Sequence, residues 1–263
     1  MADTPTEVQP PLHWGAVSQD YLKHRPGYPR EFFVLLQHLG IGLAGQDILD
    51  LGSGTGALAI PFAKQGARVT AVDLSEGQLQ AARQAAQQAG IRISFIPAPA
   101  EATGLPDHAF DVITASMCWR YFDPARMEVE APRLLRPEGL LMVSHMIWTT
   151  AESEITAQTE QLIARHNPAA KESKRGGDAA IIPDWSQARF RLKTYHEYKV
   201  NLPFTRESWR GRIRACKWIG AALSAQQTAA FDREHQALLE RIAPAQFDIR
   251  HWIRIQIFEV KRK

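Results

Sequence analysis

The sequence predicts an α/β fold: a mostly parallel sheet with helices on both faces. Short apolar runs alternate with helical segments between residues 47 and 144, and such alternation is typical of parallel strands joined by helices. A glycine-rich turn follows the first apolar run, and an acidic residue ends the second. Ligands of such sheets bind at the carboxyl ends of the strands, so we expect the functional site there.

Two helices are expected ahead of the sheet, over residues 13–24 and 29–39. The segment Arg25–Pro29 separates them as a turn, and Pro29 suits the first position of the second helix. Residues 1–13 contain acids and prolines and no apolar core, so they are predicted to be disordered and to be neither a signal nor a transit peptide.

The core is predicted to alternate strand and helix. Its strands are expected over 47–51, 67–72, 91–96, 110–115 and 140–144, and its helices over 56–65, 76–89 and 124–135. Ser75, with Gln78 three residues later, is predicted to cap the second of these helices.

The remaining residues are less regular and are expected to cover a substrate. Apolar periodicity predicts helices over 152–165, 205–223 and 224–242, and strands over 191–202 and 249–260. The polar segment 167–178 is predicted to be mobile. We expect residues 14–263 to form a single domain. In it, residues 14–145 supply an N-terminal lid and the ligand-binding core, and residues 146–263 supply substrate-covering insertions and the last two strands.

The composition is that of an ordinary soluble protein. The 263 residues carry a formal net charge of +3 and include no long basic block, which argues against a nucleic-acid partner. A mean hydropathy of -0.27, without a long apolar run, argues against a membrane span, and a cytoplasmic location is expected. Cys118 and Cys216 are far apart and outside any Cys/His cluster, so they are expected to stay reduced and no metal is predicted.

The stretch DILDLGSGTG, residues 47–56, is the most informative part of the sequence. A strand, a glycine loop and a helix start leave unpaired backbone N–H groups facing a ligand. Asp73 ends the second strand about twenty residues later, where dinucleotide-binding folds place the acid that takes ribose hydroxyls. Together the loop and the acid predict an adenosine-containing ligand.

The loop itself fits two kinds of cofactor. Gly-x-Gly-x-x-Ala, residues 52–57, matches the NAD(P) fingerprint. Asp-x-Gly-x-Gly-x-Gly, residues 50–56, resembles motif I of class I S-adenosylmethionine (SAM) methyltransferases. Other features must therefore distinguish the two cofactors.

Further features favour the second cofactor. Ala98–Ala102 with Leu105–Pro106 precedes the fourth strand, Leu134–Gly139 leads into the fifth, and a final strand follows a helical excursion. The sequence thus resembles class I SAM-dependent methyltransferases with a methyltransferase type 11 core. This resemblance implies a Rossmann-like seven-stranded, mostly parallel sheet with an antiparallel last strand and a helical substrate cover. It also implies SAM as cofactor and S-adenosylhomocysteine as product.

A looser resemblance extends over most of the chain. Tyr21–Pro29, Cys118–Asp123 and Phe204–Trp209 are similar to segments of the trans-aconitate-methyltransferase-like group of small-molecule enzymes. The sequence departs from that group at Arg120, where many relatives have histidine, so substrate preference does not transfer with the resemblance.

The resemblance implies roles for the residues near the loop. The cofactor-binding set would be Tyr21, Arg25, Asp50, Gly52, Ser53, Gly54, Asp73, Leu74, Ala100, Glu101 and Ser116. The glycine loop would approach the methionine part of SAM, and Asp50 would order the loop and the ligand's amino group. Asp73 would take the ribose hydroxyls, Leu74, Ala100 and Glu101 would flank the adenine, and Ser116 would lie near the sulfonium.

Methyl transfer from a sulfonium is an in-line displacement from an activated donor, so positioning is the main task. A general base is needed only for a protonated nucleophile, and His145 and Tyr121 are the candidates. A structural histidine bonded to loop backbone is the alternative for His145, and an ordinary tyrosine pKa argues against Tyr121.

Acceptor recognition is expected from Trp119, Arg120, Trp148, Arg214 and Trp218. An arginine and a tryptophan on one face of helix 205–223 could clamp an anionic planar substrate, and a solvated basic face is the alternative.

The leading hypothesis is SAM-dependent methyl transfer to oxygen, nitrogen or carbon of a small molecule. An NAD(P)-dependent oxidoreductase is an alternative, although the sequence has neither a Tyr-x-x-x-Lys pair after the fourth strand nor a separate catalytic domain. A SAM-binding protein without catalysis is a second alternative. A nucleic-acid methyltransferase would carry an Asn/Asp-Pro-Pro-Tyr motif where residues 116–119 read SMCW. The sequence identifies neither the acceptor nor whether the protein is a monomer or a homodimer.

Overall fold

The computed structural model describes residues 13–170, 183, 186 and 188–261. The disorder predicted for residues 1–13 and the mobility predicted for residues 167–178 fall almost entirely outside these ranges. Within the described ranges, no helix is long and apolar enough to cross a membrane.

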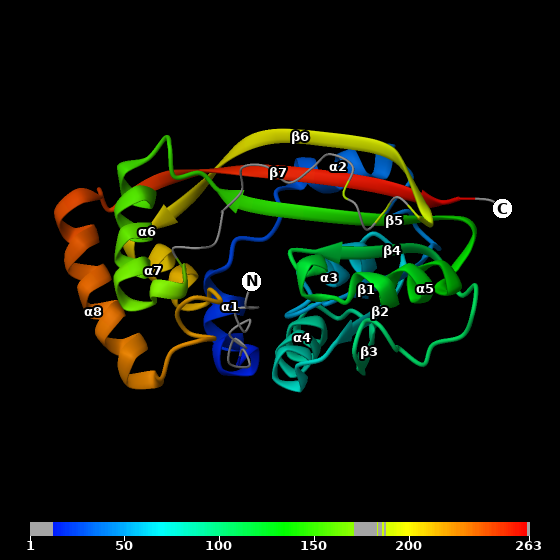
Figure 1. Cartoon of the computed structure of the whole chain (residues 1–263), viewed down its shortest axis with the longest axis horizontal. Coiled ribbons are helices and arrows are strands. Elements are labelled where there is room, and N and C mark those ends of the chain that lie inside the picture. The colour runs from blue at the N-terminus through cyan, green and yellow to red at the C-terminus, as the bar shows by residue number, and fades with distance from the viewer. Residues whose placement is uncertain (1–12, 171–182, 184–185, 187, 262–263) are drawn as a thin grey trace, which may run out of the picture.

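The described strands form one sheet in the order β3-β2-β1-β4-β5-β7-β6 (Figure 1). The strands are β1 Asp47–Leu51, β2 Arg68–Asp73, β3 Ser94–Pro97, β4 Phe110–Ser116, β5 Leu135–Trp148, β6 Phe190–Thr205 and β7 Gln246–Val260. Strands β1 to β5 pair in parallel, whereas β7 is antiparallel to both of its neighbours, β5 and β6. The predicted Rossmann-like sheet of seven strands with an antiparallel last strand is confirmed.

The sheet reverses its direction of growth at β1, which pairs with β2 on one side and with β4 on the other. Leu51, the last residue of β1, is level with Val72 in β2 and with Ala115 in β4. The turns that follow these three strands therefore meet at one edge of the sheet. This is the position where open α/β sheets bind ligands.

Apolar side chains alternate between the two faces of the sheet, as the strand geometry requires. Ile48 packs into a core with residues of α2 Arg30–His38 and α3 Ala59–Lys64. Leu49, the next residue, packs into a second core with α5 Pro124–Leu134. Helix α4 Glu76–Gln88 packs against β2 and β3. Hydrophobic cores on both faces of the sheet thus fix the positions of the strand ends that form the site.

The cover is built from both ends of the chain. It comprises a 3-10 helix at Trp14–Val17, α1 Ser18–His24, α6 Glu154–His166, α7 Arg206–Arg214 and α8 Ala225–Ile242, and shorter 3-10 helices lie at Trp119–Tyr121 and Pro168–Ala170. Figure 1 shows α6, α7 and α8 gathered at one end of the long strands β5, β6 and β7. Helix α1 contacts both α7 and α4, so it lies between this group and the core.

The single helix predicted over 205–223 is wrong, because α7 ends at Arg214. The chain turns back beyond this point, and the Gly220 N–H donates to the Arg214 carbonyl at 3.0 Å. A Cβ atom on Gly220 would lie 2.2 Å from that carbonyl oxygen, so the turn needs glycine there. Residues 215–223 therefore do not lie on the same helical face as the residues of α7.

Three other boundaries differ for identifiable reasons. Helix α3 begins at Ala59 and not at Gly56, because the glycines of the loop have positive φ angles that a right-handed helix does not use. Strand β3 begins at Ser94 and not at Ile91, whose N–H still donates to the end of α4. Strand β5 continues to Trp148 because β7 pairs with it from Leu140 to Trp148.

We predict acid destabilisation from two core histidines, His235 and His251, which are 0% and 1% exposed. Burial lowers the pKa of each to about 4, from an ordinary 6.5. Between these two values the unfolded chain binds protons that the folded chain does not, so the free energy of unfolding falls as the pH falls from 6.5 to about 4. Each histidine adds a slope of about 1.4 kcal/mol per pH unit.

Urea unfolding across this pH range measures the slope. We expect His235→Gln to lower the free energy of unfolding at neutral pH, because the new side chain fits the buried position less well. Its pH slope should be shallower by about 1.4 kcal/mol per unit, since one titrating group is gone. An unchanged slope in this variant would contradict the assignment.

Candidate functional site

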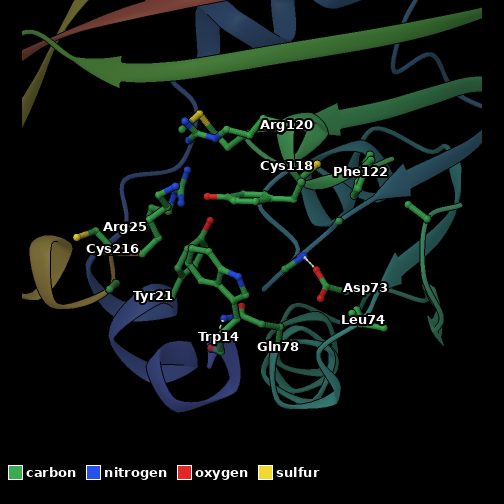
Figure 2. A pocket seen from close by; sticks show the side chains of 18 of the residues that line it. Trp14, Tyr21, Arg25, Asp73, Leu74, Gln78, Cys118, Arg120, Phe122 and Cys216 are labelled. Atoms are coloured by element: carbon green, nitrogen blue, oxygen red, sulfur yellow. Dashed lines mark hydrogen bonds between the residues drawn. The ribbon is translucent and has the colours of Figure 1, made fainter. Parts of the chain in front are cut away.

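A cavity of about 330 Å³ lies at the carboxyl ends of β1, β2 and β4, between the core and the cover (Figure 2). Core residues that line it are Gly52, Gly54, Asp73, Leu74, Gln78, Ala98, Pro99, Ala100, Glu101, Ser116, Met117, Cys118, Arg120, Tyr121, Phe122, Met146, Ile147 and Trp148. Cover residues that line it are Trp14, Tyr21, Arg25, Arg212, Ala215, Cys216, Lys217 and Trp218. The cavity thus collects most of the residues predicted for the cofactor.

The glycine loop is fastened to the end of β2 by one carboxylate. The Gly54 N–H donates to Asp73 Oδ2 at 2.8 Å, and the Ser75 N–H donates to Asp73 Oδ1 at 2.8 Å (Figure 2). Gly52 and Gly54 have φ angles of 59° and 55°. A Cβ atom on Gly52 would lie 2.7 Å from Cys118 Cβ, so this part of the loop must be bare backbone. Each oxygen of Asp73 can accept a further hydrogen bond, which leaves it capacity for ligand hydroxyls.

Asp50 and Ser53 lie beneath the loop, and neither is among the residues that line the cavity. Thr114 Oγ1 donates to Asp50 Oδ1 at 2.7 Å, and burial raises the pKa of Asp50 to about 7. The Ser53 N–H donates to the Val72 carbonyl at 3.0 Å. Asp50 therefore joins β1 to β4, and the Ser53 backbone joins the loop to β2. Direct contact of either residue with a ligand stays a prediction.

The residues predicted to flank an adenine lie at the same end of the cavity as Asp73. Leu74 is 77% exposed, an apolar side chain open to the cavity mouth. Ala100 is buried, and Glu101 lines the cavity while its Oε1 accepts the Asp123 N–H at 2.8 Å. Glu101 thereby joins the cavity rim to the start of α5.

Ser116, at the end of β4, is oriented by a buried tyrosine. The Tyr28 hydroxyl lies 2.7 Å from Ser116 Oγ and 3.2 Å from Ser144 Oγ. Burial raises the pKa of Tyr28, so its phenol keeps its proton. Met117, the next residue, has a φ angle of 63°, a strained conformation that clusters at functional sites. No sequence pattern marks a left-handed methionine, and the sequence analysis missed it.

The two candidate bases differ in position. Tyr121 lines the cavity, but burial raises its pKa and makes it a poorer base near neutral pH. His145 lies inside β5 and not at its carboxyl end, because the strand is longer than predicted, and it does not line the cavity. Burial, with the charges of Arg120 and Arg254, lowers the pKa of His145 to about 4. Its imidazole is therefore neutral at pH 7 but a weak base, because burial and the two arginines disfavour its protonated form.

The residues predicted for acceptor recognition separate into two groups. Arg120, Trp148 and Trp218 line the cavity. Trp119 is buried in the core beside α5 and does not line the cavity. Arg214 also does not line it, because its guanidinium is bound to Asp20 on α1 and to Asp232 on α8.

Arg212 and Lys217 line the cavity although the sequence analysis did not assign them. Arg212 is 4% exposed, and its guanidinium carbon lies 4.8 Å from the centroid of a Trp148 ring. Lys217 Nζ lies 4.0 Å from a Trp218 ring centroid. Helical spacing predicted Arg214 instead, but the face of α7 that carries Arg214 turns to Asp20 and Asp232.

The bare loop yields a stability prediction. Gly52→Ala places a methyl group against Cys118 at a positive φ angle, whereas Gly90→Ala meets nothing within 4 Å at a similar φ of 67°. Both variants carry the left-handed strain of about 1–2 kcal/mol. We expect Gly52→Ala to lose about 1–3 kcal/mol more, measured by urea unfolding. Equal losses in the two variants would show that the close contact is unimportant.

Comparison with known proteins adds to this geometry. A protein-family profile described as "Methyltransferase domain" matches residues 49–143. An uncharacterized methyltransferase of Mycobacterium tuberculosis is 32% identical over 144 residues, which are 55% of this chain and 55% of that protein. The chain thus spans about half the length of this curated relative.

Two further comparisons cover more of the chain. A ubiquinone biosynthesis O-methyltransferase of Actinobacillus pleuropneumoniae is 28% identical over 192 residues, 70% of this chain and 82% of that protein. The solved structure of a candidate type II methyltransferase from Anaeromyxobacter dehalogenans has a TM-score of 0.60 at 23% identity and covers 89% of this chain and 96% of its own. That structure shares the fold described above.

Proposed function

We propose that the chain is a class I SAM-dependent methyltransferase, which transfers a methyl group from SAM to a small-molecule acceptor. The observation that carries the proposal is the bare loop at Gly52 and Gly54, fastened to Asp73 at the rim of a cavity. The looser resemblance to the trans-aconitate-methyltransferase-like group stays a prediction.

The residues of the cavity fit SAM. The bare backbone of Gly52 and Gly54 would lie against the methionine part, and the spare capacity of the Asp73 carboxylate would accept the ribose hydroxyls. Leu74, with Ala100 and Glu101, would flank the adenine. Tyr21 and Arg25 would close over the cofactor from α1, since both side chains reach the cavity (Figure 2).

SAM, when bound, supplies a methyl group on a sulfonium that needs no further activation. The chain then has to hold the acceptor atom in line with that methyl group and exclude water, and such positioning is worth roughly 7–11 kcal/mol. Ser116, oriented by Tyr28, stands at the end of β4 where the sulfonium is expected. The aromatic side chains of the cover exclude water from the acceptor end.

We further propose that the acceptor carries an anionic group. The cationic lining residues are Arg25, Arg120, Arg212 and Lys217. Arg25 is the one that we assign to the cofactor, and Figure 2 shows Arg120 at the end of the cavity opposite the end that holds Asp73 and Leu74. Among the lining residues that the structure describes, the carboxylates are Asp73 and Glu101, both at the cofactor end and both bound to backbone N–H groups.

Arg212 is the strongest candidate for binding that anionic group. It is buried against Trp148, so its guanidinium acts in a poorly hydrated environment where a charge-assisted hydrogen bond is strong. A carboxylate oxygen that attacks the methyl group would need no base, because it carries no proton. A phenol or an amine would need one, and His145 could serve only through a water or a group that reaches it from the cavity.

Calorimetric titration tests the cofactor. We expect S-adenosylhomocysteine to bind the wild type with micromolar affinity and NADH not to bind. Asp73→Ala removes the acceptor of the ribose hydroxyls and unfastens the loop, so it should weaken binding by at least about tenfold, or about 1.4 kcal/mol. Asp107→Ala removes an exposed carboxylate on Arg133, away from the cavity, and is the matched control. Binding of NADH alone would overturn the proposal.

Turnover tests the acceptor class. Methyl transfer from SAM is measured for carboxylic acids and for the neutral amide of each acid. We expect transfer to the acids and none to the amides. Arg212→Met should raise the KM of the best acid by about tenfold or more, and Arg126→Met, which removes an exposed arginine of α5, should leave it unchanged. Equal turnover of acids and amides would refute the anionic acceptor, and no turnover of any acceptor would favour a SAM-binding protein without catalysis.

A further inference from the structure

The two segments of the cover that line the cavity lie against each other at close range. We define the N-terminal segment as residues 13–25 and the α7 segment as residues 206–221. A Cβ atom on Gly211 would lie 2.1 Å from the His24 ring, so α1 and α7 approach as closely as a glycine allows. The two helices contact each other and lie side by side in Figure 1.

The contact continues along both segments. The His13 N–H donates to the Ala221 carbonyl at 2.9 Å. A Cβ atom on Gly220 would lie 2.5 Å from Val17 Cγ1. Two segments about two hundred residues apart in the sequence thus pack together and form one wall of the cavity.

One guanidinium lies at the centre of this surface. Arg214 Nε donates to Asp20 Oδ2 at 2.8 Å and Nη2 donates to Asp20 Oδ1 at 3.0 Å, a two-pronged geometry. Its Nη1 donates to Asp232 Oδ1 at 2.9 Å. Arg214 therefore joins α1, α7 and α8 through a single side chain that is 21% exposed.

The neighbours of these paired residues line the cavity. Tyr21 follows Asp20, and Arg25 lies one turn further on, both on the wall proposed to cover the cofactor. Residues 215–218, which line the acceptor end, follow Arg214 directly. The ion pair thus lies where the cofactor-side wall and the acceptor-side wall of the cover meet.

We propose that Arg214 is a positioning residue that holds these two walls in register through Asp20. This inference rests on the proposed function and changes the role expected for Arg214, which acts on the ligand without touching it. When the Arg214–Asp20 pair is broken, the N-terminal segment is no longer held in its binding position. Part of the binding free energy is then spent on ordering this segment, so the apparent affinity for the cofactor falls.

Arg210 provides a matched control. It is one turn earlier on the same helix, has the same charge and binds the same Asp232, at 3.1 and 2.5 Å. Among the described residues, Arg210 forms its hydrogen bonds and ion pair with Asp232 and none with the N-terminal segment. A purely structural role predicts that the Arg210 and Arg214 variants behave alike, whereas positioning through Asp20 predicts that only the Arg214 variant loses affinity.

The experiment titrates S-adenosylhomocysteine by calorimetry into the wild type, Arg214→Gln, Asp20→Asn, their double variant and Arg210→Gln, with the melting temperature of each recorded. We expect Arg214→Gln and Asp20→Asn each to weaken binding by about tenfold. The double variant should be no weaker than the weaker single variant, because both remove one interaction. Arg210→Gln should stay within about twofold of the wild type, even where its melting temperature falls as far.

Other outcomes overturn the inference. Equal loss of affinity in Arg210→Gln and Arg214→Gln assigns the effect to general destabilisation, and unchanged affinity in Asp20→Asn removes the proposed path. If Arg214→Gln does not fold, Asp20→Asn, which is isosteric and keeps Arg214 bound to Asp232, decides alone. A wild type that does not bind S-adenosylhomocysteine overturns the proposed function as well, whereas binding with parallel losses overturns only this inference.

Discussion

The hydrogen bond from the Gly54 N–H to the Asp73 carboxylate is the interaction on which the site depends. It ties the loop after β1 to the end of β2, so that two separate turns form one rim. The loop can follow this path only because Gly52 and Gly54 take left-handed φ angles and Gly52 has no room for a side chain beside Cys118. Asp50, at the end of β1, joins that strand to β4 through its bond with Thr114. The shape of the rim is thus set by backbone geometry and by the carboxylates of Asp50 and Asp73.

Under the proposed function, the cover selects the acceptor and excludes water. Its lining comes from residues 14–25 and 212–218, and the two segments meet through close glycine contacts and through Arg214. The cavity is also divided by charge, with Asp73 and Glu101 at the proposed cofactor end and Arg120, Arg212 and Lys217 at the proposed acceptor end. This division suits a reaction in which an anionic acceptor approaches a cationic sulfonium, because each partner improves the electrostatic environment of the other.

The core of the fold and the cofactor rim could be predicted from the sequence, because they follow local rules. Alternating apolar runs identify strands and helices, and glycines with an acid about twenty residues later identify the loop and Asp73. The acceptor end could not be predicted, since it depends on tertiary contacts. The face of α7 that carries Arg210 and Arg214 pairs with Asp20 and Asp232, whereas Arg212 lines the cavity. Pairing with β7 extends β5 past His145, and no local pattern announces the left-handed Met117.

A crystal structure of the protein with bound S-adenosylhomocysteine tests most directly whether this cavity is the cofactor site. We expect the ribose hydroxyls within hydrogen-bond distance of Asp73, the adenine between Leu74 and Glu101, and the sulfur facing the acceptor end beside Ser116. Tyr21 and Arg25 should lie over the cofactor with the Arg214–Asp20 pair intact. Density for the ligand elsewhere on the molecule, or a ribose turned away from Asp73, would contradict the site and the function derived from it.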